Sequence, residues 1–422
     1  AFGAAVGAPA SPSGNVSPSS PLSVVAPPAG QSTTYCFSWV YTPGTGSAYS
    51  MVDDNVASID SALCFTISTP VDPPANNNTG GSSTTTGGGG GGSTTTTTGG
   101  GGGGGSTTTT GGGGGSTTTT GGGGGGATKL TITRIGGADR IDTADLVSQA
   151  NYANGAAGAV VLARSDLYPD SLAGTPLALG ANAPILLTPP TSLDPRTAAE
   201  IQRVLPTGGT VYLLGQTSAL SSDVENAVSQ LGYNVVRIGG TDRFETAVDI
   251  AQALKQVSQV FVASGTNYPD ALSAAAASTP TTAIVLTDGT SLPNVTNSFL
   301  GTNSSLPTWT IGGPAAQADP TPKSLVGADR YATSALVAQT FFNKPTGAGM
   351  ATGLNFPDAL TAGPFLARQG FPMLLTDPYT MPSSISTYLT GTQASLGQVD
   401  VFGGPAAVSN QLLSALTTLL GG

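Results

Sequence analysis

The stretch that decides the fold of most of this chain is Arg237-Ile238-Gly239-Gly240-Thr241-Asp242-Arg243, followed two residues later by Thr246-Ala247-Val248-Asp249-Ile250-Ala251-Gln252-Ala253-Leu254. Apolar residues in the second segment recur three and four positions apart, which predicts a helix. The next apolar run, Val260-Phe261-Val262-Ala263, is short and continuous, as in a strand buried on both faces of a parallel sheet. Strands alternating with helices predict βαβ units with right-handed crossovers.

The same pattern occurs three times, as four short blocks in a constant order. The first block is Arg134–Arg140, Arg237–Arg243 and Ser324–Arg330. The second block is Tyr168–Leu172, Tyr268–Leu272 and Phe356–Leu360. The third block is Pro184–Thr188, Ala283–Thr287 and Pro372–Thr376, and the fourth is Leu213–Gln216, Ile311–Pro314 and Phe402–Pro405. The predicted fold class is α/β, with three tandem parallel-sheet α/β/α repeats at 128–236, 237–323 and 324–422.

The segment before the repeats has a different composition. Residues 1–33 are rich in Pro, Ser and Ala, and they predict an extended arm within a first region at 1–75. Two aromatic and β-branched runs, Thr34–Tyr41 and Ala62–Ile67, predict the strands of a small β unit. Each run contains one of the two cysteines, and we expect a disulfide between Cys36 and Cys64, with two buried free thiols as the alternative.

Residues 76–127 are a low-complexity tract of glycine runs and Ser/Thr blocks. Residues 76–126 of the tract have no apolar side chains to bury, so in an isolated chain it is expected to be a flexible linker. The alternative is ordered packing against neighbouring chains in a polymer, because glycine runs can pair their backbones.

The composition excludes several classes of function. The net charge is −10, which argues against nucleic acid and against an anionic membrane surface. There is no His for a catalytic triad or a proton shuttle, and no His/Cys cluster for a metal. A Gly-x-Gly-x-x-Gly fingerprint is missing from all three repeats, so no dinucleotide is expected. We therefore expect a protein that is not an enzyme and has no metal and no cofactor.

The expected location is outside the cell. The chain starts with Ala1-Phe2-Gly3-Ala4-Ala5, which is typical of a mature N-terminus after signal-peptide cleavage. No run of about 18 apolar residues is present, so no membrane span is expected.

The four blocks resemble the cell-wall-binding repeat 2 family of Gram-positive surface proteins, over residues 128–422. The resemblance implies three repeats around a pseudo-threefold axis and non-covalent attachment to anionic secondary wall polymer. The chain departs from the family pattern at Gln216-Thr217, where the other repeats have Gly-Pro, at Ser324 and Val326, and at Leu167. The three repeats therefore need not bind polymer equally.

Each repeat contains one Asp-Arg pair between a glycine turn and a helix: Asp139-Arg140, Asp242-Arg243 and Asp329-Arg330. Strand ends are where open α/β sheets bind ligands, and a guanidinium there could hold a phosphate or carboxylate of the polymer. The alternative is an ion pair, buried or between repeats, that fixes how the repeats dock.

A second set of polar residues belongs to the Pro-Asp block: Asp170, Asp270 and Asp358, with Asn267 and Asn355 three residues earlier. Asn at an N-cap, Pro in the first turn and Asp at the positive end of the helix dipole together explain this block as a helix start. Hydrogen bonding to sugar hydroxyls is the alternative.

Two functions are consistent with these patterns. In the first, the repeats anchor a non-enzymatic surface protein to the wall polymer and display the N-terminal region. In the second, the chain is a self-associating subunit of an extracellular filament or surface layer, assembled through the β unit and the Gly/Thr tract.

Overall fold

The computed structural model describes residues 32–37, 63–68, 107–110, 116–120 and 130–421. The chain divides into two units, Ala1–Gly89 and Gly90–Gly422. In the first unit, β1 (Ser32–Phe37) and β2 (Leu63–Ser68) pair antiparallel, with Cys36 opposite Cys64. The two strands overlap the predicted runs, and the disulfide-stapled unit stays a prediction. Residues 1–31 of the predicted arm lie outside the described residues, and residues 32–33 belong to β1.

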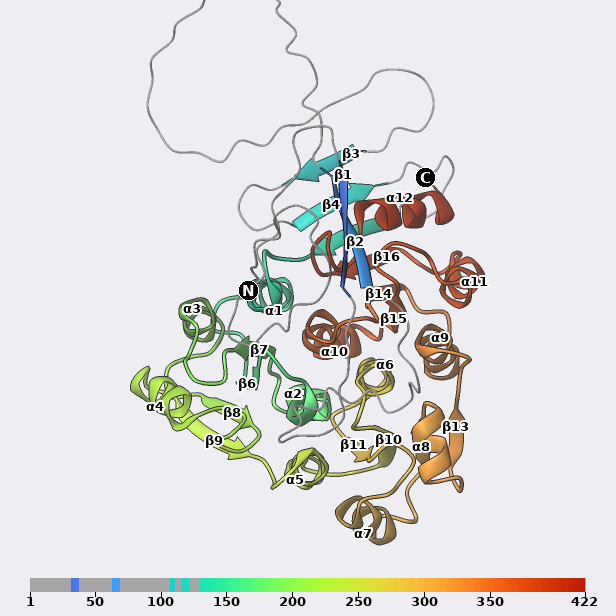
Figure 1. The fold of residues 1–422 in the computed structure, drawn as a ribbon. Coiled ribbons are helices and arrows are strands. Elements are labelled where there is room, and N and C mark those ends of the chain that lie inside the picture. The colour runs from blue at the N-terminus through green and yellow to red at the C-terminus, as the bar shows by residue number, and fades with distance from the viewer. Residues whose placement is uncertain (1–31, 38–62, 69–106, 111–115, 121–129, 422) are drawn as a thin grey trace, which may run out of the picture. The chain divides into compact units, whose positions relative to one another are not determined.

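The second unit contains three parallel sheets, as predicted (Figure 1). The first has the order β7-β6-β8-β9 and consists of β6 (Ala159–Arg164), β7 (Ile185–Thr188), β8 (Thr210–Leu214) and β9 (Asn234–Ile238). The second has the order β11-β10-β12-β13 and consists of β10 (Gln259–Ser264), β11 (Thr282–Thr287), β12 (Thr308–Ile311) and β13 (Lys323–Leu325). The third contains β15-β14-β16-β5, which are β14 (Gly347–Thr352), β15 (Met373–Thr376), β16 (Gln398–Phe402) and β5 (Thr131–Ile135).

The sheets are offset by one strand from the repeats in the sequence. β9 and β13 each begin a repeat of the sequence, yet they complete the sheet of the repeat before. β5 stands before the first helix of the unit and pairs with β16 of the last repeat, with Thr131 opposite Gln398. The boundary predicted between 236 and 237 therefore falls within β9, and β5 closes the three repeats into a cycle.

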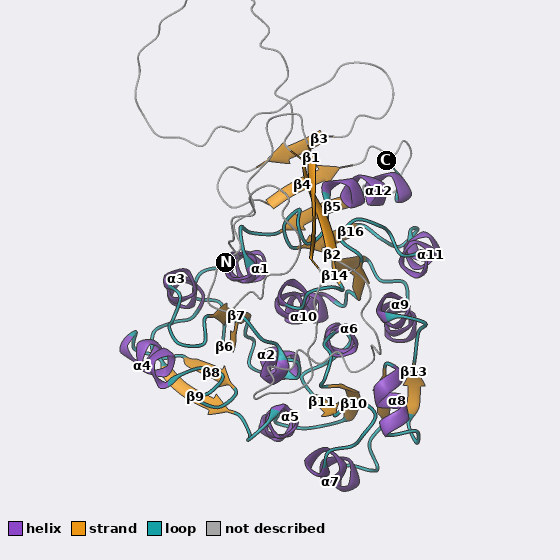
Figure 2. Ribbon diagram, viewed as in Figure 1, coloured by secondary structure: helices purple, strands orange, loops and turns teal. Residues whose placement is uncertain are grey.

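The helices form an outer and an inner set (Figure 2). The outer set is α3 (Pro195–Val204), α4 (Ser222–Gln230), α7 (Asn294–Thr302), α8 (Gly313–Ala318), α11 (Ser383–Thr392) and α12 (Asn410–Leu419). The inner set begins with the first helix of each repeat, which is α1 (Arg140–Asn151), α5 (Arg243–Ala253) and α9 (Arg330–Phe341). Each of these helices packs on the sheet of its own repeat. Each also packs on one helix of the preceding repeat, as α1 on α10, α5 on α2 and α9 on α6, and we call this contact between repeats a seam. In the part of the chain that the structure describes, no helix is long and apolar enough to cross a membrane.

The three central helices are α2 (Gly174–Gly180, after the short helix η1, Pro169–Ser171), α6 (Pro269–Ala276) and α10 (Pro357–Gln369). They lie side by side in the middle of the unit (Figure 1). A Cβ added at Gly363 of α10 would lie 2.7 Å from Thr175 Oγ1 of α2 and 3.5 Å from Ala275 Cβ of α6. Each of these residues lies seven positions after the N-cap residue of its Pro-Asp helix, so the helices run in parallel around one axis.

Two segments of the Gly/Thr tract are strands rather than flexible linker. β3 (Thr107–Thr110) and β4 (Ser116–Thr120) pair antiparallel, and β4 pairs antiparallel with β5. β-branched Thr favours strands, and β5 offers an unpaired backbone edge that a neighbouring strand can satisfy. The sequence alone did not place a sheet edge beside these threonines.

Candidate functional site

Three aromatic side chains meet where the central helices begin. Tyr168, Tyr268 and Phe356 follow β6, β10 and β14, and each is the N-cap residue before a Pro. The ring centroids lie 5.2 Å apart for Tyr168 and Tyr268, 5.7 Å for Tyr168 and Phe356, and 6.2 Å for Tyr268 and Phe356. Phe356 is buried and the two tyrosines are half-buried. The three repeats thus contribute one ring each to a shared aromatic cluster.

The three arginines of the Asp-Arg blocks occupy matching positions beside this cluster. Nη1 donates to the carbonyl of the residue after the first strand of the repeat: Arg140 to Ser165 at 2.6 Å, Arg243 to Gly265 at 2.7 Å and Arg330 to Gly353 at 2.6 Å. The Arg140 guanidinium also lies 5.6 Å from the centre of the Phe356 ring, which belongs to another repeat. All three arginines are half-buried.

The aspartates of the same blocks cap helices and do not pair with the neighbouring arginines. Asp139 Oδ1 accepts from Ile141 N at 3.0 Å and Asp142 N at 2.9 Å, and Asp242 and Asp329 cap α5 and α9 in the same way. Among the described residues, Asp139 forms its ion pair with Arg196 at 3.0 Å. The alternative was an ion pair, buried or between repeats; the ion pair that Asp139 forms is instead exposed and lies within the first repeat, and its carboxylate also caps the helix N-terminus.

The aspartates of the Pro-Asp blocks lie at the seams between repeats. Thr246 Oγ1 of the second repeat donates to Asp170 Oδ1 of the first at 2.9 Å. Asp358 of the third repeat is bonded in the same way by Thr143 of the first. Burial raises the pKa of Asp358, and the hydrogen bond from Thr143 and the charge of Arg140 oppose that rise. Burial also raises the pKa of Asp270, to about 6, against the charge of Arg330.

A glycine of the fourth block makes room for each of these aspartates. Gly215, Gly312 and Gly403 have φ values of +89°, +89° and +101°, a region that favours glycine. An added Cβ at Gly403 would lie 2.5 Å from Asp358 Oδ2, and one at Gly215 would lie 2.9 Å from Asp170 Cγ. This geometry favours the helix-start and docking role of the aspartates over contact with sugar.

The two asparagines are exposed at the rim of the aromatic cluster. Asn267 Oδ1 accepts from Tyr268 N at 2.9 Å, and Asn355 Oδ1 accepts from Phe356 N at 3.0 Å. They therefore lie one residue before the N-cap, not at it, because the Pro that follows the aromatic residue sets the helix start. Leu167 and Leu354 beside them are exposed large apolar residues.

We call this region the axial face: Tyr168, Tyr268, Phe356, Arg140, Arg243 and Arg330. It combines three guanidiniums, three aromatic rings and the N-terminal ends of the central helices, where the macrodipole is positive. Such a set can stack against sugar rings and hold an anionic substituent by charge-assisted hydrogen bonds. Among the described residues, no group of three or more His, Cys, Asp or Glu could hold a metal ion.

The repeated blocks of the sequence indicate the arginines but not the aromatic cluster. The signal was present, because an aromatic residue stands before Pro-Asp in all three second blocks. That signal does not show that the three rings touch, since they are about 100 and 90 residues apart in the chain.

Comparison with known proteins agrees with this architecture. A model of the family described as "Cell wall binding domain 2" matches residues 134–225, 237–320 and 325–413. The N-acetylmuramoyl-L-alanine amidase LytC of Bacillus subtilis is 26% identical over 296 residues, which cover 68% of this chain and 58% of the amidase. The resemblance stated from the sequence is therefore confirmed.

Two solved structures share the fold. Cwp8 from Clostridium difficile gives a TM-score of 0.62 at 25% identity, covering 72% of this chain and 59% of Cwp8. Cwp6 from Clostridium difficile gives a TM-score of 0.59 at 26% identity, covering 69% of this chain and 49% of Cwp6. This chain thus matches less than two thirds of the length of the amidase or of either Cwp protein.

Proposed function

Because the chain belongs to the cell wall binding domain 2 family, we propose that it is a non-enzymatic surface protein that attaches to anionic cell-wall polymer through the axial face. The observation that carries the proposal is the convergence of three guanidiniums and three aromatic rings on one axis. The family and the Cwp structures support a location at the cell wall or cell surface.

The chemistry of the axial face fits a polymer that carries both sugar rings and negative charge. Each guanidinium donates one N–H to a backbone carbonyl, which fixes its position. The carbonyl is uncharged, so the positive charge of the guanidinium is not neutralised. A positioned guanidinium presents its remaining N–H groups as a fork for phosphate or carboxylate. Attachment through such charges should weaken as salt is raised, because exposed charges are screened within about 8 Å at physiological ionic strength.

A binding role also fits the residues that are absent from the whole sequence. The chain contains no His, so it lacks the usual general base for hydrolysis. The amidase activity named for LytC belongs to that protein, of which this chain matches 58%.

The test is sedimentation of the full chain with purified cell walls. We expect Arg243→Ala to lower the bound fraction at limiting wall concentration, with an affinity loss on the order of tenfold for each 1.4 kcal/mol of lost contact. Lys255→Ala is the matched control, because it removes one exposed positive charge beyond the other end of α5. An Arg243→Ala protein that melts like the parent and sediments like the parent would show that the axial face does not hold the polymer.

A further inference from the structure

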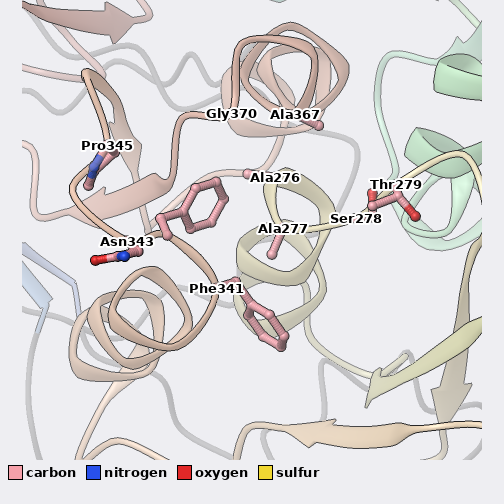
Figure 3. Close-up of a pocket in the computed structure, with 10 residues that line it drawn as sticks. Ala276, Ala277, Ser278, Thr279, Phe341, Asn343, Pro345, Ala367 and Gly370 are labelled. Carbon is pink, nitrogen blue, oxygen red and sulfur yellow. The ribbon is translucent and has the colours of Figure 1, made fainter.

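A pocket of about 300 Å³ lies at the seam between the second and third repeats (Figure 3). Its walls are the ends of three helices: Ala276 and Ala277 at the end of α6, Phe341 and Phe342 at the end of α9, and Ala367 and Gly370 at the end of α10. The axial face is at the other end of α6 and α10, so the pocket is separate from the proposed polymer site.

The electrostatic character of the pocket is set by these helix ends. Ala277, Phe342 and Gly370 are the C-cap residues of α6, α9 and α10, and all three line the pocket. The last carbonyls of a helix have no partner within the helix, and the macrodipole is negative there. Three C-termini around one pocket favour a positively charged occupant.

Two aromatic residues, Phe341 and Phe342, line the pocket, and packing fixes the first of them. The Phe341 ring packs against Trp309 at 5.2 Å and Phe261 at 5.1 Å between centroids, and Phe342 beside it is half-buried. An aromatic ring face attracts a cation, and the attraction increases where water is excluded.

The seam between the third and first repeats shows that a cation can lie over the aromatic ring equivalent to Phe342. Tyr152 follows the twelve-residue helix α1 as Phe342 follows the twelve-residue helix α9, so the two rings are equivalent. At that seam Arg368, from the last turn of α10, places its guanidinium 4.7 Å from the centre of the Tyr152 ring. The second repeat has Thr279 and Pro280 where the third has Arg368, counted from the third block and from the Pro-Asp block. Among the described residues, no arginine or lysine lies over the Phe342 ring.

The seam between the first and second repeats has no aromatic ring at this place. The C-cap residue of α5 there is Leu254, and Lys255 after it is exposed. The guanidinium over Tyr152 is therefore the example of a positive charge at a seam ring. Residues 1–128 contain no Lys or Arg, so they have no side-chain cation to place over Phe342.

We propose that the pocket between α6, α9 and α10 binds a small organic cation, an ammonium or guanidinium on a compact body, over the Phe342 ring. The bound group takes the position that Arg368 occupies at the equivalent seam. Lys344 follows the lining residue Asn343 but is itself exposed and is not part of the lining.

The test is isothermal titration calorimetry of the full chain with n-propylguanidinium, n-propylammonium and the neutral n-propanol. We expect saturable binding of both cations with a dissociation constant on the order of 1 mM, and no saturation with n-propanol at the same concentrations. Equal binding of n-propanol would overturn the proposal, because the pocket would then recognise the apolar body alone.

Variants separate the ring from the shape of the pocket. Phe342→Leu keeps an apolar side chain but removes the ring face, and we expect at least fivefold weaker binding of n-propylguanidinium. Phe342→Tyr keeps the ring and should bind like the parent. Thr279→Arg supplies a cation from the rim and should abolish binding while wall sedimentation stays unchanged. A folded Phe342→Leu protein with parental affinity would refute the role of the ring.

Discussion

At the scale of single residues, three different residues meet where the central helices pack on one another. Gly363, Thr175 and Ala275 occupy the same level of the three central helices, and Thr175 Oγ1 is buried without a hydrogen-bond partner among the described residues. The repeats are therefore equivalent in position but not in sequence at the axis. The same residue in all three repeats would leave a void between the central helices if it were small, or would clash there if it were large.

We predict that Gly363→Ala destabilises the protein, because its Cβ would lie 2.7 Å from Thr175 Oγ1. Overpacking of this kind costs about 1–3 kcal/mol. Thr175→Ala removes both the Oγ1 and the Cγ2 atoms from this level, so the double variant should recover most of the loss. Urea denaturation followed by circular dichroism measures both effects. Equal losses in the single and double variants would place the strain elsewhere.

At the scale of elements, the first helix of each repeat packs on an outer helix, α1 on α3, α5 on α7 and α9 on α11, and the residues in this contact differ between repeats. The residues six positions after the two N-caps are Asp145 and Glu200 in the first repeat, Val248 and Phe299 in the second, and Ala335 and Tyr388 in the third. All six are buried. The first repeat thus holds two carboxyl groups where the others hold an apolar contact.

The two carboxyl groups have different partners. Glu200 accepts from Arg203 at 2.6 Å and from Gln149 at 3.3 Å, whereas Asp145 Oδ1 has no partner among the described residues. Burial and the charge of Glu200 raise the pKa of Asp145 to about 8, and Arg196 opposes that rise while Asp194 and Asp142 add to it. At neutral pH the folded protein therefore holds a proton that the unfolded chain releases.

We predict that stability falls as pH rises from about 4 to about 8, since a carboxyl with a raised folded pKa binds more protons when folded. Its stabilisation is complete below the unfolded pKa and is lost as pH rises through the folded pKa. Asp145→Val should melt higher than the parent at pH 8 and show a flatter melting temperature across this window. Asp223→Asn, exposed on α4, is the control. Parallel curves for Asp145→Val and the parent would contradict the assignment.

At the scale of the whole second unit, the sequence predicted the three repeats and their blocks but not how they close. Apolar runs mark strands such as β6 and β10, because burial on both faces fixes a local pattern. β13 is Lys323-Ser324-Leu325 with two exposed residues, and it has no such pattern. Which sheet each strand joins is a long-range choice, since β5 pairs with a strand more than 260 residues away. The axial cluster needs all three repeats around one axis, and the pocket at the end of α9 needs the packing of two neighbouring repeats, so neither could be placed from spacing alone.

The turn after α12 indicates how the cycle could be reconnected. α4 ends in Leu231-Gly232, with Gly232 at φ +88°, and leads after Tyr233 into β9. α12 is followed in the same way by Leu420-Gly421, with Gly421 at φ +101°. Leu130 and Leu420 pack in the same hydrophobic cluster, so β5 starts beside the end of α12.

We predict that a circular permutant in which Gly421 runs directly into Leu130–Ile135, and which begins at Gly136, folds to the same three sheets. The new connection copies the one between α4 and β9, and surface connections of this kind tolerate permutation. Its melting temperature should lie within a few degrees of that of residues 129–422, whereas deleting Leu130–Ile135 should expose the edge of β16 and lower it well beyond that. A deletion variant as stable as the permutant, and equally monomeric in analytical ultracentrifugation, would show that β5 does not close the cycle.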